Sequence, residues 1–297
     1  MHRIVVCSAR LVAVHNSHVA RELSDRYTDV AIRSIRMGVA GPPESTRIER
    51  QQTIRERHGI PEDALLFCTF GLITPEKRIA RAIEAVAWLR AEFPQVYLML
   101  VGDSVPHYDA RADALRAGLL DRIRLTGYVP EEELHAYIET ADVGLCLRWP
   151  SSGETSASWL RCLAAGKATV TTDLEHTADE PVMDPRSWAT LGNQPAITLR
   201  LDLLDEDHSL RLAIRRLARD VGFRERLGAS GRAWWAGQHT LQHMHEDYEH
   251  VIEEAINLPD PAYTLPPHLR HDGLENLRAL LKPFGRDATG FEGSKVL

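Results

Sequence analysis

Short apolar runs rich in β-branched and aromatic residues alternate with helical patterns along this chain, and this alternation constrains the fold most. The runs are LVAV at Leu11, VAIRSI at Val30, LLFCTF at Leu65, VYLMLV at Val96, RIRLT at Arg122, VGLCL at Val143 and ATVT at Ala168. Such an order is typical of βαβ units around a parallel sheet. LLFCTF and VYLMLV are almost continuously hydrophobic, which indicates central strands covered on both faces. We therefore expect an α/β, Rossmann-like fold with a parallel sheet and helices on both faces.

Apolar residues at helical spacing between the runs predict the covering helices. Ile79, Ile83, Val86 and Leu89 recur on one side of a segment whose other side carries arginines and glutamates. Further helices are expected at 18–26, 48–58, 110–117, 131–140, 155–165, 210–217 and 223–227, and over the long stretch 232–255. From Asn257 the chain changes character, because four prolines lie within 258–269. This predicts an extended linker, followed by a small amphipathic helix at about 274–281.

Composition and charge exclude several classes of function. The net charge is -7, with acidic and basic residues interspersed, so nucleic acid is not an expected partner. No run approaches the roughly 20 apolar residues of a membrane span, and the opening MHRIVVCSARLVAV is too short and too quickly interrupted by charge to be expected to act as a signal peptide. The cysteines lack the spacing of zinc or redox motifs, which predicts free thiols and a cytoplasmic location. His239 and His243 lie four residues apart, but a solvated helix face is favoured over zinc, and no metal site is expected.

Ligands of open parallel sheets bind outside the carboxyl ends of the strands, so three strand exits are candidates. The first contains Gly71 and ends at Lys77, a cation suited either to a phosphate or to a solvated first turn of a helix. The second is Val101-Gly102-Asp103. The third, 149–156, carries small and hydroxylated residues into a helix, where backbone N–H groups could hold a diphosphate or a Ser or Thr could serve as a plain N-cap. Both interpretations of each loop stay open at this point.

Five segments occur in a fixed order along the chain. They are the glycine-led loop 71–77 ending in Pro-Glu-Lys, Val101-Gly102, TGYVPEEEL at 126–134, Ala141-Asp142-Val143 with a following Pro-Ser loop, and LAAGKATV at 163–170. In this order, the stretch from about 65 to 173 resembles the donor-binding domain of GT4-type retaining glycosyltransferases of the GT-B fold. Weaker similarity extends from Val12 to about Ala255. The resemblance implies a GT-B C-terminal domain with a helical C-terminal extension.

The resemblance also implies roles for particular residues. Lys77 would neutralise the diphosphate as negative charge develops on the leaving group. The implied catalytic residues are Lys77, Glu154 and Arg161, and the implied donor-binding residues are Gly71, Thr74, Gly102, Tyr128, Val129, Gly153, Thr155 and Ser156. Backbone amides of Thr155 and Ser156 would hold the phosphates, the backbone near Tyr128 would line the base pocket, and the Gly153-Glu154 corner would face the sugar. The family generally needs no bound metal, and the implied ligand is a nucleoside-diphosphate sugar as donor substrate rather than a cofactor.

The chain departs from the family pattern at three positions. Leu72 stands where the family usually has an arginine after the first loop glycine. Arg161 and Gly153 stand where a pair of glutamates is usual, with Glu154 displaced by one residue. One hypothesis is that Arg161 supplies the phosphate-binding cation that Leu72 does not.

The domain organisation follows from the same resemblance. The segment LVAVHNS resembles the last strand of the first GT-B domain, so most of the acceptor-binding half is expected to be absent. We expect residues 1–40 to be a remnant of the acceptor domain and crossover, 41–230 the nucleotide-sugar-binding domain, 231–256 a crossover helix that packs back toward the first domain, and 257–297 a proline-rich tail with a short helix.

The function implied is hexosyl transfer, with retention, from a nucleoside-diphosphate sugar to a glycan or lipid-linked acceptor in bacterial glycan or cell-envelope synthesis. A separate acceptor-binding domain is a conceivable partner, and membrane contact would be peripheral at most. A non-catalytic nucleotide-sugar-binding or interaction module is the alternative favoured by the altered glutamates. A flavodoxin-like regulatory domain would share the βα alternation, but it does not predict Lys77 together with the Ser-Ser-Gly-Glu-Thr-Ser loop.

Overall fold

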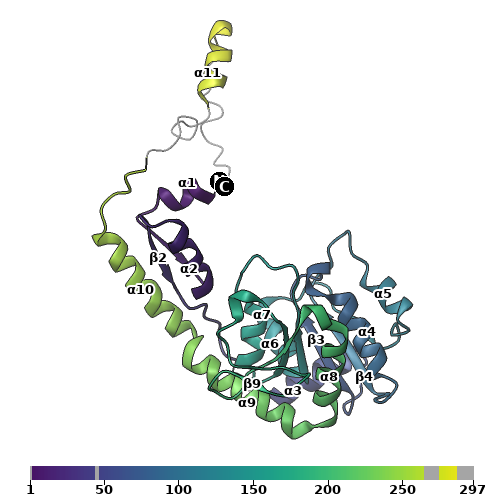
Figure 1. Cartoon of the computed structure of the whole chain (residues 1–297). Helices are drawn as coiled ribbons and strands as arrows, with labels where there is room; N and C mark the ends of the chain where they lie inside the picture. The colour runs from purple at the N-terminus through teal and green to yellow at the C-terminus, as the bar shows by residue number, and fades with distance from the viewer. Residues whose placement is uncertain (1, 44–46, 264–273, 286–297) are drawn as a thin grey trace.

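A single large sheet organises most of the chain in the computed structural model, which describes residues 2–43, 47–263 and 274–285 (Figure 1). Its strand order is β5-β4-β3-β6-β7-β10-β8-β9, and every pairing is parallel except that of β8 with β9. The strands are β3 (Leu65–Phe70), β4 (Val96–Val101), β5 (Ile123–Leu125), β6 (Val143–Cys146), β7 (Ala168–Thr172), β8 (Val182–Met183), β9 (Thr190–Leu191) and β10 (Leu199–Leu201). The predicted parallel α/β sheet is confirmed.

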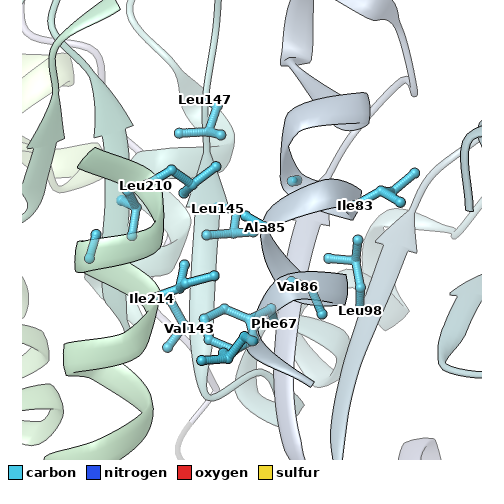
Figure 2. Packing of buried hydrophobic residues seen from close by; sticks show 14 of the residues in the cluster. Phe67, Ile83, Ala85, Val86, Leu98, Val143, Leu145, Leu147, Leu210 and Ile214 are labelled. Atoms are coloured by element: carbon cyan, nitrogen blue, oxygen red, sulfur yellow. The ribbon is translucent and has the colours of Figure 1, made fainter. Parts of the chain in front are cut away.

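Helices cover both faces of the sheet because successive strand residues point to opposite sides. In β3, Phe67 joins the cluster formed with α4 (Ile79–Leu89), α5 (Ala110–Arg116) and α8 (Glu206–Arg219). Its neighbours Leu66 and Cys68 belong to the opposite cluster, with residues of α3 (Arg47–Arg57), α6 (Glu131–Thr140) and α7 (Ala157–Ala164). Figure 2 shows side chains of the first cluster, in which Ile214 of α8 and Val86 of α4 both approach the sheet. This two-sided burial explains the continuous hydrophobicity of β3 and β4.

A smaller unit precedes the large sheet. It contains α1 (His2–Cys7), β1 (Leu11–Val14), α2 (Ser17–Arg26) and β2 (Ala31–Ser34), with β1 and β2 paired in parallel. The long helix α10 (Leu241–Asn257) runs beside this unit (Figure 1). Asp247 of α10 accepts hydrogen bonds from the backbone N–H and the guanidinium of Arg36, with a shortest distance of 2.6 Å. The long helix near the end of the described chain thus contacts residues of its first part.

Several boundaries differ from the sequence-based expectation. The helix expected over 232–255 is two helices, because the chain bends at His239 and the Thr240 side chain caps α10. The expected domain boundary at 230/231 lies inside α9 (Val221–Gln238). The short strands β8, β9 and β10 were not predicted, and neither was α1. The small helix near the C-terminus is confirmed as α11 (Glu275–Leu281), followed by a 3₁₀ turn, whereas Pro266 and Pro267 lie outside the described residues.

Two further expectations concern the thiols and the membrane. All four cysteines are free, with Cys68 and Cys162 buried and Cys7 and Cys146 partly exposed. Within the described residues, no helix is both long enough and apolar enough to cross a bilayer.

Candidate functional site

Two loops meet at the carboxyl edge of the sheet, one after β3 and one between β6 and α7. The Lys77 ammonium donates a hydrogen bond to the carbonyl of Phe70, and the Ser158 hydroxyl donates to the same carbonyl at 3.5 Å. The backbone N–H of Trp149 donates to the carbonyl of Glu76 at 2.7 Å, which joins the loops a second time. Lys77 therefore lines one cavity together with Ser156 and Ser158.

Two glycines make room for this arrangement. Gly71 has φ +82°, and a Cβ there would lie 2.7 Å from the Lys77 ammonium nitrogen. Gly102, at the end of β4, has φ +143°, and a Cβ there would lie 2.3 Å from the carbonyl oxygen of Gly71. Larger residues would push the β3 exit away from its neighbour or displace the lysine. The lack of space for a Cβ therefore explains why glycine occurs at both strand exits.

Lys77 is a cation held in a partly buried position. It ends a 3₁₀ turn over Pro75–Lys77 rather than the first turn of α4, because Arg78 adopts a left-handed conformation. Within the described part of the chain, no carboxylate forms an ion pair with it. Burial, with the nearby positive charge of Arg148, lowers the pKa of Lys77 to about 8. A bound anion would favour its charged form, so the site is suited to an anionic ligand.

Arg148 is a second cation at this edge, and the sequence reasoning missed it. It lies two residues beyond β6 and lines a further cavity with Leu72, Thr74 and Lys77. Its guanidinium forms an ion pair with Glu154. The signal that could have found it is a basic residue directly after a predicted strand, at the sheet edge that already carried Lys77.

Glu154 is bound by its own loop. Its carboxylate accepts hydrogen bonds from the backbone N–H of Ser152 at 2.9 Å, the Ser152 hydroxyl at 2.7 Å and the Ser151 hydroxyl at 3.2 Å. Gly153, with φ +83°, lies against α2, since a Cβ there would be 3.2 Å from Val19 Cγ2. The corner predicted to face a sugar thus lies between the two cations and the first part of the chain.

The start of α7 supplies backbone donors to the same region. Ser156 is its N-cap, and its hydroxyl accepts the N–H of Trp159 at 3.3 Å, so the capping interpretation of this serine is confirmed. The N–H groups of Ala157 and Ser158 have no acceptor within the helix, as for any first turn. The Thr155 hydroxyl donates instead to the carbonyl of His15 at 2.8 Å, and Thr155 lines a neighbouring cavity that Ser156 shares but Lys77 does not.

The remaining predicted residues lie at different distances from the cations. Tyr128 is 76% exposed on the loop after β5, while Val129 packs partly against the core. Arg161 forms an ion pair with Glu131 at 2.5 Å and lines none of the cavities described above. The structure therefore brings Lys77, Thr74, Glu154 and Ser156 together around Arg148, and it places Arg161 elsewhere.

Known proteins resemble parts of this chain in sequence and in fold. Residues 50–221 match the family described as glycosyl transferases group 1. The lipopolysaccharide core biosynthesis glycosyltransferase LpsD of Rhizobium meliloti (strain 1021) is 30% identical over 173 residues, 58% of this chain and 44% of the relative. A 2-deoxystreptamine glucosyltransferase of Streptomyces kanamyceticus is 32% identical over 93 residues, 31% of this chain and 24% of that relative. The chain thus spans less than half the length of these curated relatives.

Solved structures agree with the fold. A glycosyltransferase from Rickettsia africae superposes with a TM-score of 0.70 at 14% identity, covering 86% of this chain and 65% of that one. Anabaena HepE, solved in complex with UDP and glucose, gives 0.67 at 15% identity, with 86% and 66% covered. The family match covers more than half of the sequence, and the chain belongs to the group 1 glycosyl transferases.

Proposed function

We propose that this chain binds a nucleoside-diphosphate sugar and acts in glycosyl transfer with retention, in the manner of a GT4-type enzyme. The observation that carries the proposal is the anion-binding edge built from Lys77, Arg148 and the first turn of α7. Lys77, Arg148 and the backbone N–H groups at the start of α7 border cavities that share residues. Such a site is suited to the pyrophosphate of a nucleotide donor, and preorganised charge of this kind stabilises a leaving diphosphate.

The two cations have distinct roles in this proposal. Lys77, held against the Phe70 carbonyl, provides the charge that the family pattern expects. Arg148 provides the second positive charge, which Leu72 lacks, because its guanidinium borders the cavity that Leu72 and Lys77 also line. In the free protein Glu154 neutralises Arg148, so phosphate binding exchanges one anionic partner of the arginine for another. Arg161, the sequence-based candidate for this role, is engaged by Glu131 instead.

The rest of the donor would extend from this edge. Exposed Tyr128 and the neighbouring backbone of Val129 would offer a surface for the base, and the sugar would lie beside Glu154, which lines a cavity with Lys77, and its chain neighbour Gly153. The name of one relative, a lipopolysaccharide core biosynthesis glycosyltransferase, supports a glycan or lipid-linked acceptor. No metal is assigned a role, and the donor is a substrate rather than a cofactor. The four free thiols support a cytoplasmic location.

A non-catalytic sugar-nucleotide-binding module is the second candidate, and the positions of Gly153 and Arg161 favour it because the family usually has glutamates there. Calorimetry with UDP, ADP and GDP, followed by incubation with UDP-glucose carrying a labelled sugar, separates the two. Binding with release of labelled glucose or its transfer supports the enzyme, whereas binding without turnover supports the module. A folded chain that binds none of the three diphosphates contradicts both.

A further inference from the structure

The large sheet opens between β3 and β6 beside the anion-binding edge. The register of these two strands ends at the pair Cys68–Gly144, although both strands continue beyond it. Two residues further along β3, the carbonyl of Phe70 accepts hydrogen bonds from side chains, the Lys77 ammonium and the Ser158 hydroxyl. A small cavity lies in this opening, and apolar side chains of β6 and of the loop after it form part of its wall. The strands therefore part at the position where the Lys77 ammonium is held.

Thr69 lines this cavity with a hydroxyl group that has no partner. Only 2% of the residue is exposed, and no group in the described parts of the chain forms a hydrogen bond with its Oγ1 atom. Because successive strand residues alternate in direction, Thr69 points to the same face of the sheet as Phe67, where Leu145 and Leu147 also pack. A buried polar group without a partner costs free energy, so a hydroxyl beside two leucines calls for a specific explanation.

The size of the cavity suits a single water molecule. Its volume is about 20 Å³, and a cavity needs roughly 10–15 Å³ on the same measure to hold one water. The polar groups on its wall include the Thr69 hydroxyl, which donates and accepts, and the Lys77 ammonium, which only donates. A water oxygen can accept a hydrogen bond from the ammonium while the water donates to the threonine, and the Ser158 hydroxyl offers a further partner. Such a water would satisfy the buried hydroxyl.

We propose that an ordered water in this cavity joins the Thr69 hydroxyl to the Lys77 ammonium, and that Thr69 is thereby a positioning residue for the lysine. Lys77 borders two cavities, this small one and the larger one that it lines with Thr74 and Arg148. The water and the Phe70 carbonyl each accept one hydrogen of the ammonium, which leaves the last hydrogen for an anion in the larger cavity. The inference rests on the proposed function only for the identity of that anion.

The protonation of Lys77 reports on this water. A water that accepts a hydrogen bond from the ammonium favours the charged form, whereas burial and the positive charge of Arg148 lower the pKa of the lysine. Among the described residues, the other titratable or charged groups that line the two cavities come from β6, the loop after it and the turn of Lys77; they are Cys146, Arg148, Glu154 and Glu76. Replacing Thr69 by valine leaves each of them in place, so a change in the Lys77 pKa isolates the hydroxyl.

Side-chain NMR of the free protein tests the proposal without any nucleotide. The resonances of isotope-labelled lysine are followed against pH, and Lys77→Arg identifies the Lys77 signal among those of Lys77, Lys167, Lys282 and Lys295. Thr69→Val is expected to lower the pKa of Lys77 by roughly 0.5–1 unit, as the loss of about one hydrogen bond would. Thr69→Ser keeps a hydroxyl and is expected to change that pKa by less than about 0.3 unit. Thr190→Val, at an exposed threonine of β9, is the matched control and is expected to leave the Lys77 pKa unchanged.

The outcomes separate a bridging water from a merely structural threonine. An unchanged Lys77 pKa in Thr69→Val overturns the proposal, and so does a Thr69→Ser variant that lowers the pKa as far as valine does. A crystal structure with a water between Thr69 and Lys77 supports it, and one in which this cavity is dry or holds a phosphate oxygen of UDP overturns it.

UDP calorimetry on the same variants reports separately on the proposed function. Thr69→Val is expected to weaken UDP binding by about threefold to tenfold near neutral pH, because the ammonium loses both its anchor and part of its charge. If wild type binds UDP and Thr69→Val binds it equally well, the positioning role is overturned. A wild-type chain that binds no UDP contradicts the proposed function instead, while the lysine titration still decides whether the water is present.

Discussion

Replacing Glu154 by glutamine is expected to strengthen the binding of a nucleoside diphosphate, although a site carboxylate in an enzyme usually supports its function. In the free protein this carboxylate pairs with Arg148 and accepts three further hydrogen bonds from Ser151 and Ser152. An incoming diphosphate must take the guanidinium from it and approach its negative charge. Glutamine retains most of the hydrogen bonds and removes the charge, so the diphosphate displaces the guanidinium more easily and meets less electrostatic repulsion.

The structure sets the size of each effect. A hydrogen bond to a charged group contributes about 2 kcal/mol, so Arg148→Ala is expected to weaken UDP binding about 30-fold. The side chains of Arg148 and Glu154 are 30% and 39% exposed, and solvent screens their pairing. The expected gain for Glu154→Gln is therefore smaller, about 0.5–1 kcal/mol or roughly three-fold tighter binding. In the double variant the substitution at 154 still removes a repulsive charge, so the double variant is expected to bind better than Arg148→Ala alone.

Calorimetric titration of UDP at low ionic strength tests all four proteins of this cycle, with Arg161→Ala as the matched arginine control. Since Arg161 pairs with Glu131 outside the cavities, its loss is expected to change the affinity less than about twofold. The reasoning is refuted if Glu154→Gln weakens UDP binding, or if Arg161→Ala costs as much as Arg148→Ala. The first result would remove the second phosphate contact from the edge that carries Arg148. The second would return that contact to Arg161, the sequence-based candidate.

Three further predictions concern the site and its supports. The pKa of Lys77 is lowered to about 8, so the free lysine loses its proton as pH rises through 8, and UDP affinity is expected to fall by up to about tenfold per pH unit above that value. In Lys77→Arg this pH dependence should vanish, and a wild-type affinity that stays flat from pH 7 to 9 would contradict the assignment. Gly102→Ala would bring a Cβ to 2.3 Å from the Gly71 carbonyl oxygen at φ +143°, so the free energy of unfolding in denaturant is expected to fall by about 1–3 kcal/mol and UDP binding to weaken. Gly118→Ala, whose Cβ meets nothing within 4 Å, should lower the free energy of unfolding less and leave UDP binding unchanged. The hydrogen bond from Arg36 holds the pKa of Asp247 below its usual value, so its stabilisation is present above the unfolded-state pKa and is lost as pH falls through the folded-state pKa. The difference in unfolding free energy between wild type and Asp247→Asn, about 1 kcal/mol at pH 7, should shrink toward zero below pH 4. A constant difference from pH 7 to 3 would show that the pair contributes nothing.

The elements that were predicted correctly are those with strong local patterns. β3 and β4 are apolar throughout because helices cover both faces, and α4 shows a clear apolar stripe, so each could be recognised alone. β10 has only three residues and owes its position to pairing with β7 and β8, which local sequence does not encode. The break at His239 was missed because helical patterns continue on both sides of it.

The site shows the same division between local and tertiary information. Lys77 and Ser156 could be proposed from the sequence because glycine, proline and hydroxyl residues mark loops at strand ends. Arg148 was missed because its role depends on two loops that meet only through the Phe70 carbonyl and the Glu76 carbonyl. Glu180 lies in a segment without periodicity, and only the folded chain shows that it lines a cavity together with Arg148 and Glu154.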